Sequence, residues 1–217
     1  MKGNLRLKKI AEMISKGMIV ADIGTDHAFL PIMLVQNGIS DRVYACDVAE
    51  GPLKGARENI AKSGLSDRIS TILTDGLHDV PMDTDCVVIA GMGFVTARGI
   101  LERDMDRLSK LERIIVEVNR DTVEMRRWIS EHGFTITDEV YVRDRGHDYV
   151  TIGFTTAPHV SYNEKDIVLG PVLMKRKDPD YLNYLKEREK KLVHILAVSG
   201  NENGQIQKEL SIIRESY

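Results

Sequence analysis

The sequence of 217 residues contains only two cysteines, Cys46 and Cys86. They lie far apart and form no Cys-x-x-Cys spacing, which argues against a disulfide framework and against a structural zinc site. Both fall in apolar segments that we expect to be buried strands. We therefore interpret the two cysteines as thiols of the core, and we expect no metal site.

The sequence also lacks an apolar run of membrane-spanning length, and its start is amphipathic rather than apolar like a signal peptide. These features predict a cytoplasmic protein without membrane contact. The formal net charge of −3 gives no overall attraction to nucleic acid, so RNA binding would need a local basic patch. We expect no DNA partner, and the sequence leaves the oligomeric state open.

Residues 19–31 combine an apolar run, an acid, one glycine and a helix-compatible segment, a pattern typical of strand, tight loop and helix. A glycine-rich loop that binds a diphosphate would read Gly-x-Gly-x-x-Gly, but here only Gly24 is present and Asp26 takes the second glycine position. Asp22 and Asp26 would repel a diphosphate, whereas they suit the ammonium and sulfonium groups of S-adenosylmethionine. Alternatively, Gly24 only turns the chain, and both acids are solvated or cap the helix.

Two further predicted strands end in acids that suit a nucleoside. Asp47 ends the strand 42–47 and lies 23 residues after Gly24, close to the spacing at which an acid binds ribose hydroxyls. Asp75 follows the strand 69–73 and can accept a hydrogen bond from an adenine amino group. The alternatives are an acid that faces water at position 47 and an ordinary Asp-Gly turn at position 75.

A fourth predicted strand, 85–90, is a near-continuous apolar run and is followed by Gly91-Met92-Gly93-Phe94. The two glycines allow the backbone to pass close to a substrate beside the methyl donor. Enzymes that methylate exocyclic amines usually resemble one another here in an Asn/Asp-Pro-Pro-aromatic motif. Its absence from this chain argues against an exocyclic amine as the acceptor.

The order of predicted elements indicates an α/β fold. Five parallel strands alternate with helices, and an antiparallel pair over 134–142 and 147–154 follows. This is the pattern of the class I (Rossmann-like) S-adenosylmethionine-dependent methyltransferase sheet with an antiparallel edge strand. We interpret Trp128 as core packing against the sheet rather than as a ligand-stacking residue. The expected helices of this part cover residues 5–16, 27–37, 49–63, 95–109 and 121–132.

Composition changes after Pro158, so we divide the chain into a methyltransferase domain, 1–158, and a C-terminal helical domain, 159–217. A helix that begins at Pro179 and a final helix are separated by a break over 199–204. Their narrow apolar stripes, at steps of three and four residues, predict a small coiled-coil-like helical hairpin.

A short apolar-then-basic element over 164–176 precedes this hairpin and leads into the cluster Lys175-Arg176-Lys177. Acids are interleaved with the basic residues of the region. The cluster is therefore either a contact for RNA phosphates or a solvated face.

Five motifs occur together: Ala21-Asp22-Ile23-Gly24-Thr25-Asp26-His27-Ala28-Phe29-Leu30-Pro31, Gly51-Pro52-Leu53, Asp75-Gly76-Leu77, Val88-Ile89-Ala90-Gly91-Met92-Gly93 and Leu169-Gly170-Pro171. In these motifs the chain strongly resembles the bacterial TrmK family of tRNA (adenine(22)-N(1))-methyltransferases. The similarity runs nearly end to end. Family members usually have Gly where this chain has Phe94, Gln-Pro-Asn where it has Glu117-Val118-Asn119, and commonly Glu where it has Asp47.

The resemblance implies S-adenosylmethionine as cofactor, tRNA as partner, and methyl transfer to N1 of adenine 22. We hypothesise that Asp26 and Asn119 act in catalysis, and that the exposed base stacks on an aromatic such as Phe29 or Phe94. Together with the cluster Lys175, Arg176 and Lys177, these two aromatics are the expected substrate-binding residues. The expected cofactor-binding residues are Asp22, Gly24, Thr25, Asp26, His27, Asp47, Val48, Asp75, Gly76, Leu77, Ala90, Gly91, Met92 and Gly93.

Two rival functions follow from the same residues. A nicotinamide-dependent oxidoreductase would use the same strand, loop and helix, although the missing glycines disfavour it. A protein that binds S-adenosylmethionine or RNA with a divergent acceptor, or without catalysis, would account for Phe94 and Val118.

Overall fold

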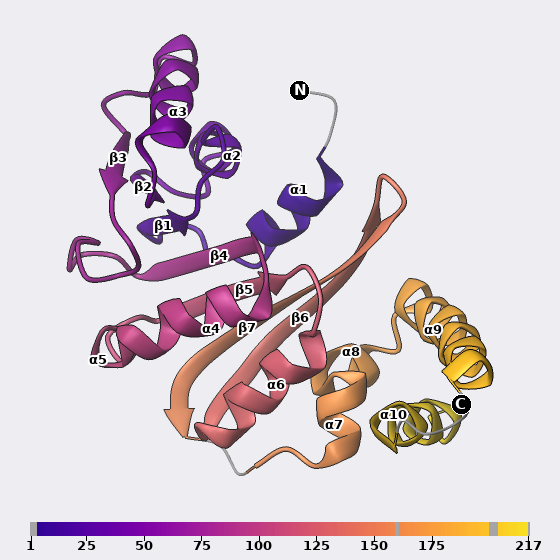
Figure 1. Ribbon diagram of the computed structural model, residues 1–217. Coiled ribbons are helices and arrows are strands. Elements are labelled where there is room, and N and C mark those ends of the chain that lie inside the picture. The colour runs from indigo at the N-terminus through magenta and orange to yellow at the C-terminus, as the bar shows by residue number, and fades with distance from the viewer. Residues whose placement is uncertain (1–3, 159–160, 200–203, 217) are drawn as a thin grey trace.

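The computed structural model describes residues 4–158, 161–199 and 204–216. Its centre is a seven-stranded sheet in the order β3-β2-β1-β4-β5-β7-β6 (Figure 1). The first five strands in this order are parallel, whereas β7 is antiparallel to both β5 and β6. The predicted α/β sheet with an antiparallel edge is confirmed. The strands are β1 Val20–Ile23, β2 Val43–Asp47, β3 Ile69–Leu73, β4 Cys86–Met92, β5 Arg113–Val118, β6 Phe134–Asp144 and β7 His147–Pro158.

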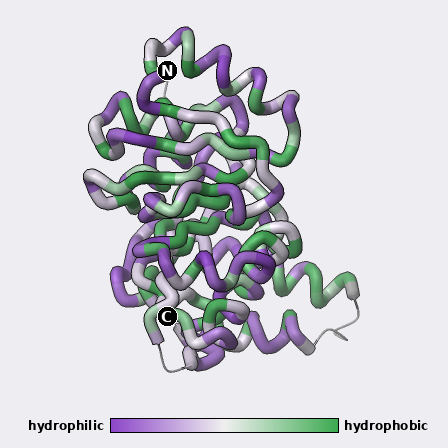
Figure 2. The backbone as a smooth tube through the Cα atoms, turned by 90° about the vertical axis from the view of Figure 1, so that its left-hand side faces the viewer, coloured by the Kyte–Doolittle hydropathy of each residue, from purple (hydrophilic) through white to green (hydrophobic). Residues whose placement is uncertain are grey.

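Helices cover both faces of the sheet, and a separate apolar cluster fills each layer. One cluster joins α1, α2 and α3 to the sheet, and the other joins α4, α6 and the C-terminal helices to it (Figure 1). Figure 2 shows hydrophobic stretches along the central strands and hydrophilic residues on the outer turns. The helices of these layers are α1 Leu5–Glu12, α2 Phe29–Gln36, α3 Glu50–Lys62, α4 Phe94–Arg103, α5 Met105–Leu108 and α6 Thr122–Glu131.

The first helix ends earlier than the expected range of 5–16, and a long-range contact explains why. In a continuing helix the N–H of Gly17 would donate to the carbonyl of Met13. That carbonyl instead accepts from Arg113 Nη1 at 2.7 Å, and Gly17 donates to Ile39 at 2.8 Å. A side chain 100 residues away in sequence therefore ends the helix.

The expected helix 95–109 is broken at Asp104 into α4 and α5. The Asp104 side chain accepts a hydrogen bond from the backbone N–H of Leu77 at 2.8 Å, and the Asp104 backbone is not helical. The expected helix 27–37 begins only at Phe29, because His27 and Ala28 both have positive φ.

The C-terminal region is helical, as predicted, and packs on the same apolar cluster as α4 and α6. The element expected over 164–176 consists of two helices that meet at Gly170, whose φ is +83°. Both the domain boundary near residue 159 and most of the expected break over 199–204 lie outside the described residues, so the division into two domains stays a prediction. The helices are α7 Glu164–Leu169, α8 Pro171–Arg176, α9 Pro179–Ser199 and α10 Gly204–Arg214.

Three smaller predictions concern the core and the membrane. Cys46 and Cys86 are free and fully buried, and Trp128 packs edge-on against Phe134 and Phe154. These core assignments are confirmed. Within the described part of the chain, no helix combines the length and apolarity required to cross a bilayer.

Candidate active site

The turn after β1 is fixed against the neighbouring strand β2. The backbone N–H groups of Gly24 and Thr25 both donate to the carbonyl of Cys46, each at 2.8 Å. Gly24 has a φ of +75°, and His27 and Ala28 also adopt positive φ. Two consecutive non-glycine residues in this conformation are held at an energetic cost, as is common where a loop is shaped for a ligand.

The two acids of this loop occupy different environments. Asp22 is buried and accepts a hydrogen bond from Thr25 Oγ1 at 2.7 Å, and its burial raises its pKa to about 6. The Asp26 side chain is 81% exposed and lies 3.2 Å from His27 Nε2. Asp22 and Thr25 therefore stabilise the loop from the interior of the fold, whereas Asp26 is accessible to a ligand.

The free energy of unfolding of the wild type should depend on pH through Asp22, and the Asp22→Asn variant should lose this dependence. Because the pKa is raised in the folded state, the carboxyl favours folding when protonated, below about pH 4, and this contribution is lost as the pH rises through about 6. A shift of about two units corresponds to about 3 kcal/mol. Urea unfolding between pH 4 and pH 7 should show the decline in the wild type and a flatter curve in the variant; parallel curves would contradict the assignment.

Asp47 lies at the carboxyl end of β2, beside the β1 loop. Its Oδ1 accepts from the backbone N–H of Ala49 at 2.8 Å, which fixes the carboxylate, while Oδ2 has no hydrogen-bond partner among the described residues. The next residue, Val48, is 67% exposed. An oriented acid followed by an exposed apolar side chain fits a ribose with an adjoining base.

Replacement of Asp47 by alanine should weaken S-adenosylmethionine binding about 10- to 100-fold, because a hydrogen bond to a charged group contributes about 1.5–3 kcal/mol. Isothermal titration calorimetry measures the change. Asp47→Glu is the matched control, since it keeps the carboxylate, and it should bind within about threefold of the wild type. Equal weakening by both variants would assign the loss to local packing rather than to the carboxylate.

Two residues at the junction of α4 and α5 bind the segment that follows β3. Arg103 donates to both oxygens of Asp75, at 2.6 and 3.0 Å, and Asp104 accepts from Leu77 N–H. The arginine lowers the pKa of Asp75. Because the Arg103–Asp75 pair is exposed and solvent screens it, the pair is weak, and the Asp75 carboxylate stays available to another donor such as an amino group.

The end of β4 lies beside the β1 loop. A Cβ placed on Gly24 would lie 2.1 Å from the Met92 methyl group, so the glycine allows Met92 to approach closely. The Asn119 Nδ2 atom donates to the Gly91 carbonyl at 2.9 Å, and the Asn119 N–H donates to the Met92 carbonyl at 2.9 Å. The β5 end thereby fixes the turn that includes Gly91 and Gly93, and Ala90 lies at the bulge that precedes it.

A buried charge network beneath this turn was not predicted from the sequence. Arg6 of α1 pairs with the fully buried Glu117 at 2.7 Å, and Thr151 donates to the other carboxylate oxygen at 3.3 Å. Burial raises the pKa of Glu117. The Arg6 guanidinium also lies beside Gly91 and 5.0 Å from the centre of the Tyr149 ring. An acid inside the otherwise apolar run 114–118 was the available indication of such a pair.

The expected substrate-binding residues do not form one surface. Phe29 is exposed beside the His27 ring, at 5.5 Å, whereas Phe94 is half-buried and packs on the core. Lys175 and Lys177 are exposed near the end of α8, and Arg176 between them pairs with Asp138 at 2.8 Å. The structure thus brings the strand-end residues together but places the basic cluster at the end of α8, where Arg176 contacts β6.

Comparisons with known proteins agree with this geometry. A family described as "Methyltransferase domain" matches residues 4–152. A tRNA (adenine(22)-N(1))-methyltransferase of Bacillus subtilis is 33% identical over 188 residues, which cover 84% of this chain and 79% of that protein. The structure of M. capricolum TrmK with S-adenosyl-homocysteine has a TM-score of 0.82 and 31% identity, covering 99% of this chain and 97% of that one. The chain belongs to the TrmK family.

A Streptococcus pneumoniae protein in complex with S-adenosyl-L-methionine is also similar, with a TM-score of 0.89 and 30% identity over 98% of both chains. In this TrmK protein, Glu117 and Phe94 stand at two of the positions where the sequence differs from the usual family pattern. Glu117 gains an internal partner in Arg6, and Phe94 packs against the core. These two departures are thus accommodated inside the fold beside the turn 91–93.

The residues of this TrmK chain fit S-adenosylmethionine at each part of the molecule. The outer oxygen of Asp47 is available to a ribose, and Asp75 has a cation-binding carboxylate that an amino group can engage. Exposed Asp26 supplies negative charge close to the β1 turn, where an ammonium and a sulfonium would be favoured. The carboxyl edge of the sheet therefore offers a suitable group to the sugar, the base and the methionine of the cofactor.

Proposed function

We propose that this chain transfers a methyl group from S-adenosylmethionine to N1 of adenine 22 in tRNA. The observation that carries the proposal is the 33% identity to the Bacillus subtilis enzyme over most of both chains. The cluster of Gly24, Asp26, Asp47 and Asn119 at the carboxyl edge of the sheet supports it.

Each strand end has a part in this function. We assign the ribose to Asp47, the adenine of the cofactor to Asp75 and Leu77, and the methionine end to the loop Gly24–His27 above Asp22. When bound, S-adenosylmethionine supplies an electrophilic methyl group. The turn 91–93, held by Asn119, is where the acceptor base approaches.

Adenine N1 carries an in-plane lone pair, so the acceptor needs no base to activate it, and the protein mainly has to align it. We assign to Asp26 the acceptance of a hydrogen bond from the adenine amino group. Its carboxylate also favours the positive charge that the adenine ring gains as N1 is methylated. Asn119 lies on the neighbouring strand end and holds the same edge of the base, and exposed Phe29 provides a stacking surface.

The test has two parts, binding and transfer. The protein should bind S-adenosylmethionine in preference to NAD at equilibrium, and it should incorporate labelled methyl groups into unmodified bacterial tRNA. Preference for NAD would support the oxidoreductase instead. Binding of the cofactor and of tRNA without incorporation would support the non-catalytic alternative.

A further inference from the structure

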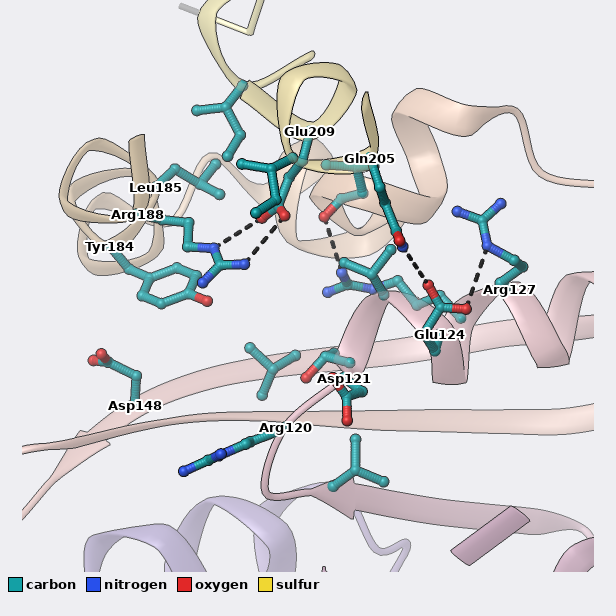
Figure 3. Close-up of a pocket in the computed structure, with 18 of the residues that line it drawn as sticks. Arg120, Asp121, Glu124, Arg127, Asp148, Tyr184, Leu185, Arg188, Gln205 and Glu209 are labelled. Carbon is teal, nitrogen blue, oxygen red and sulfur yellow. Dashed lines mark hydrogen bonds and ion pairs between the residues drawn. The ribbon is translucent and has the colours of Figure 1, made fainter. Parts of the chain in front are cut away.

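An open groove of about 440 Å³ begins at the proposed acceptor site and runs to the C-terminal hairpin. It is lined by Asn119 and Arg120 after β5, by Tyr149 near the start of β7, and by Tyr184 and Lys191 of α9. A neighbouring cavity shares several of these residues. Figure 3 shows Arg120 and Asp148 on its sheet side and Tyr184 and Arg188 on its α9 side. Three separate segments of the chain therefore meet around one space.

Asp148 is the acid among the described residues that line this groove, and it has partners within the protein, whereas two of the lining cations have none. Asp148 accepts from the Tyr141 hydroxyl at 2.7 Å and lies 3.6 Å from Arg143, and the lining cation Arg188 makes two hydrogen bonds to Glu209, at 2.8 and 3.1 Å. Arg120 and Lys191 are both exposed. Within the described ranges, neither side chain has an ion-pair or hydrogen-bond partner. The groove thus presents uncompensated positive charge although the chain is acidic overall.

The Tyr149 ring lines the groove and is held in place by neighbouring side chains. The Tyr149 ring is half-buried, with the Arg6 guanidinium 5.0 Å from its centre and the His147 ring edge-on at 6.4 Å. Arg6 is itself held by the buried Glu117. A fixed ring beside unpaired cations is the combination that binds single-stranded or looped nucleic acid, because bases stack on the ring and cations meet phosphates.

We propose that this groove binds the ribose–phosphate segment of tRNA that adjoins the target adenosine, with Arg120 and Lys191 on its phosphates and Tyr149 against a flanking base. The inference rests on the proposed function, which makes tRNA the substrate. Asn119 connects the groove to the proposed acceptor site, because it lines the groove and also fixes the turn 91–93 at which we propose that the base is methylated. The groove, rather than the cluster 175–177, is the main RNA contact outside the acceptor site.

Charge reversal tests the two cations. The double variant Arg120→Glu/Lys191→Glu should bind unmodified tRNA at least about tenfold more weakly, and its plot of log K against log salt should flatten by about one to two units. S-adenosylmethionine binding should be unchanged. Lys62→Glu/Lys110→Glu is the matched control: it makes the same charge change at exposed sites at the end of α3 and before β5, at the opposite edge of the sheet, and should bind tRNA within about twofold.

Two more variants separate the contribution of the groove from that of neighbouring surfaces. Tyr149→Leu should weaken tRNA binding at least about fivefold, whereas Tyr149→Phe, which keeps the ring, should bind normally. Lys175→Glu/Lys177→Glu should have a smaller effect than the groove variant. Unchanged tRNA affinity and salt dependence in the groove variant, while the wild type methylates tRNA, would overturn the groove proposal alone. Absence of methylation by the wild type would overturn the proposed function, whichever way the binding results fall.

Discussion

Methyl transfer by the Asp26→Asn variant is expected to fall by about two to three orders of magnitude at saturating S-adenosylmethionine. The substitution keeps the size of the side chain and removes the charge that favours the cationic product. Because the carboxylate is 81% exposed and its one ion-pair partner among the described residues is His27, the variant should fold as stably as the wild type. The measurement is kcat with unmodified tRNA, together with thermal unfolding.

A second exposed aspartate provides the control for this result. Asp41 lies before β2, at the opposite edge of the sheet, and like Asp26 it pairs with one neighbouring basic side chain, that of Arg68. Asp41→Asn should leave kcat within about twofold. Full activity in Asp26→Asn would contradict the catalytic role of Asp26, and an equal loss in Asp41→Asn would show that the effect is one of overall charge.

Replacement of Glu139 by glutamine should lower the free energy of unfolding by about 3–5 kcal/mol. Glu139 on β6 is fully buried and binds Arg126 of α6 at 2.6 Å, and its other oxygen accepts from the backbone of Val172 at 2.8 Å. Arg126 donates in turn to the carbonyls of Ile167 and Val168. The variant keeps the shape of the side chain but leaves the Arg126 charge uncompensated in the interior.

Urea unfolding measures this loss, with Glu164→Gln as the control. Glu164 also pairs with an arginine, Arg127 at 2.9 Å, and with Lys208 at 3.3 Å, but the side chains of Glu164 and Arg127 are 30% exposed and that of Lys208 is 60% exposed. Its loss should therefore cost about 1 kcal/mol or less. Similar small effects from both variants would show that the buried pair does not attach α7 and α8 to the sheet.

The parts of the site that could be predicted from the sequence are those set by local pattern. An apolar run that ends in an acid and a glycine identifies the end of a parallel strand, so the sequence pattern alone places Gly24, Asp47 and Asp75 at one edge. The hairpin between β6 and β7 follows in the same way, and Arg145 and Gly146 at its tip both have positive φ, as a two-residue turn requires.

The parts that could not be predicted depend on contacts between residues distant in sequence. The end of α1 is set by Arg113, and the break between α4 and α5 accompanies the bond from Leu77 to Asp104. The Arg6–Glu117 pair joins residues 111 positions apart. Periodicity and motif spacing contain no information about such partners, which is why the groove at Asn119 is visible only in the folded chain.

The acceptor atom is best tested by methylation of two unmodified tRNAs that differ only in having adenosine or guanosine at position 22, with nucleoside analysis of the products. We expect N1-methyladenosine in the first tRNA and no incorporation into the second. Equal methylation of both tRNAs, or a product methylated at another atom of adenine, would contradict the assignment of adenine 22 N1 as the acceptor.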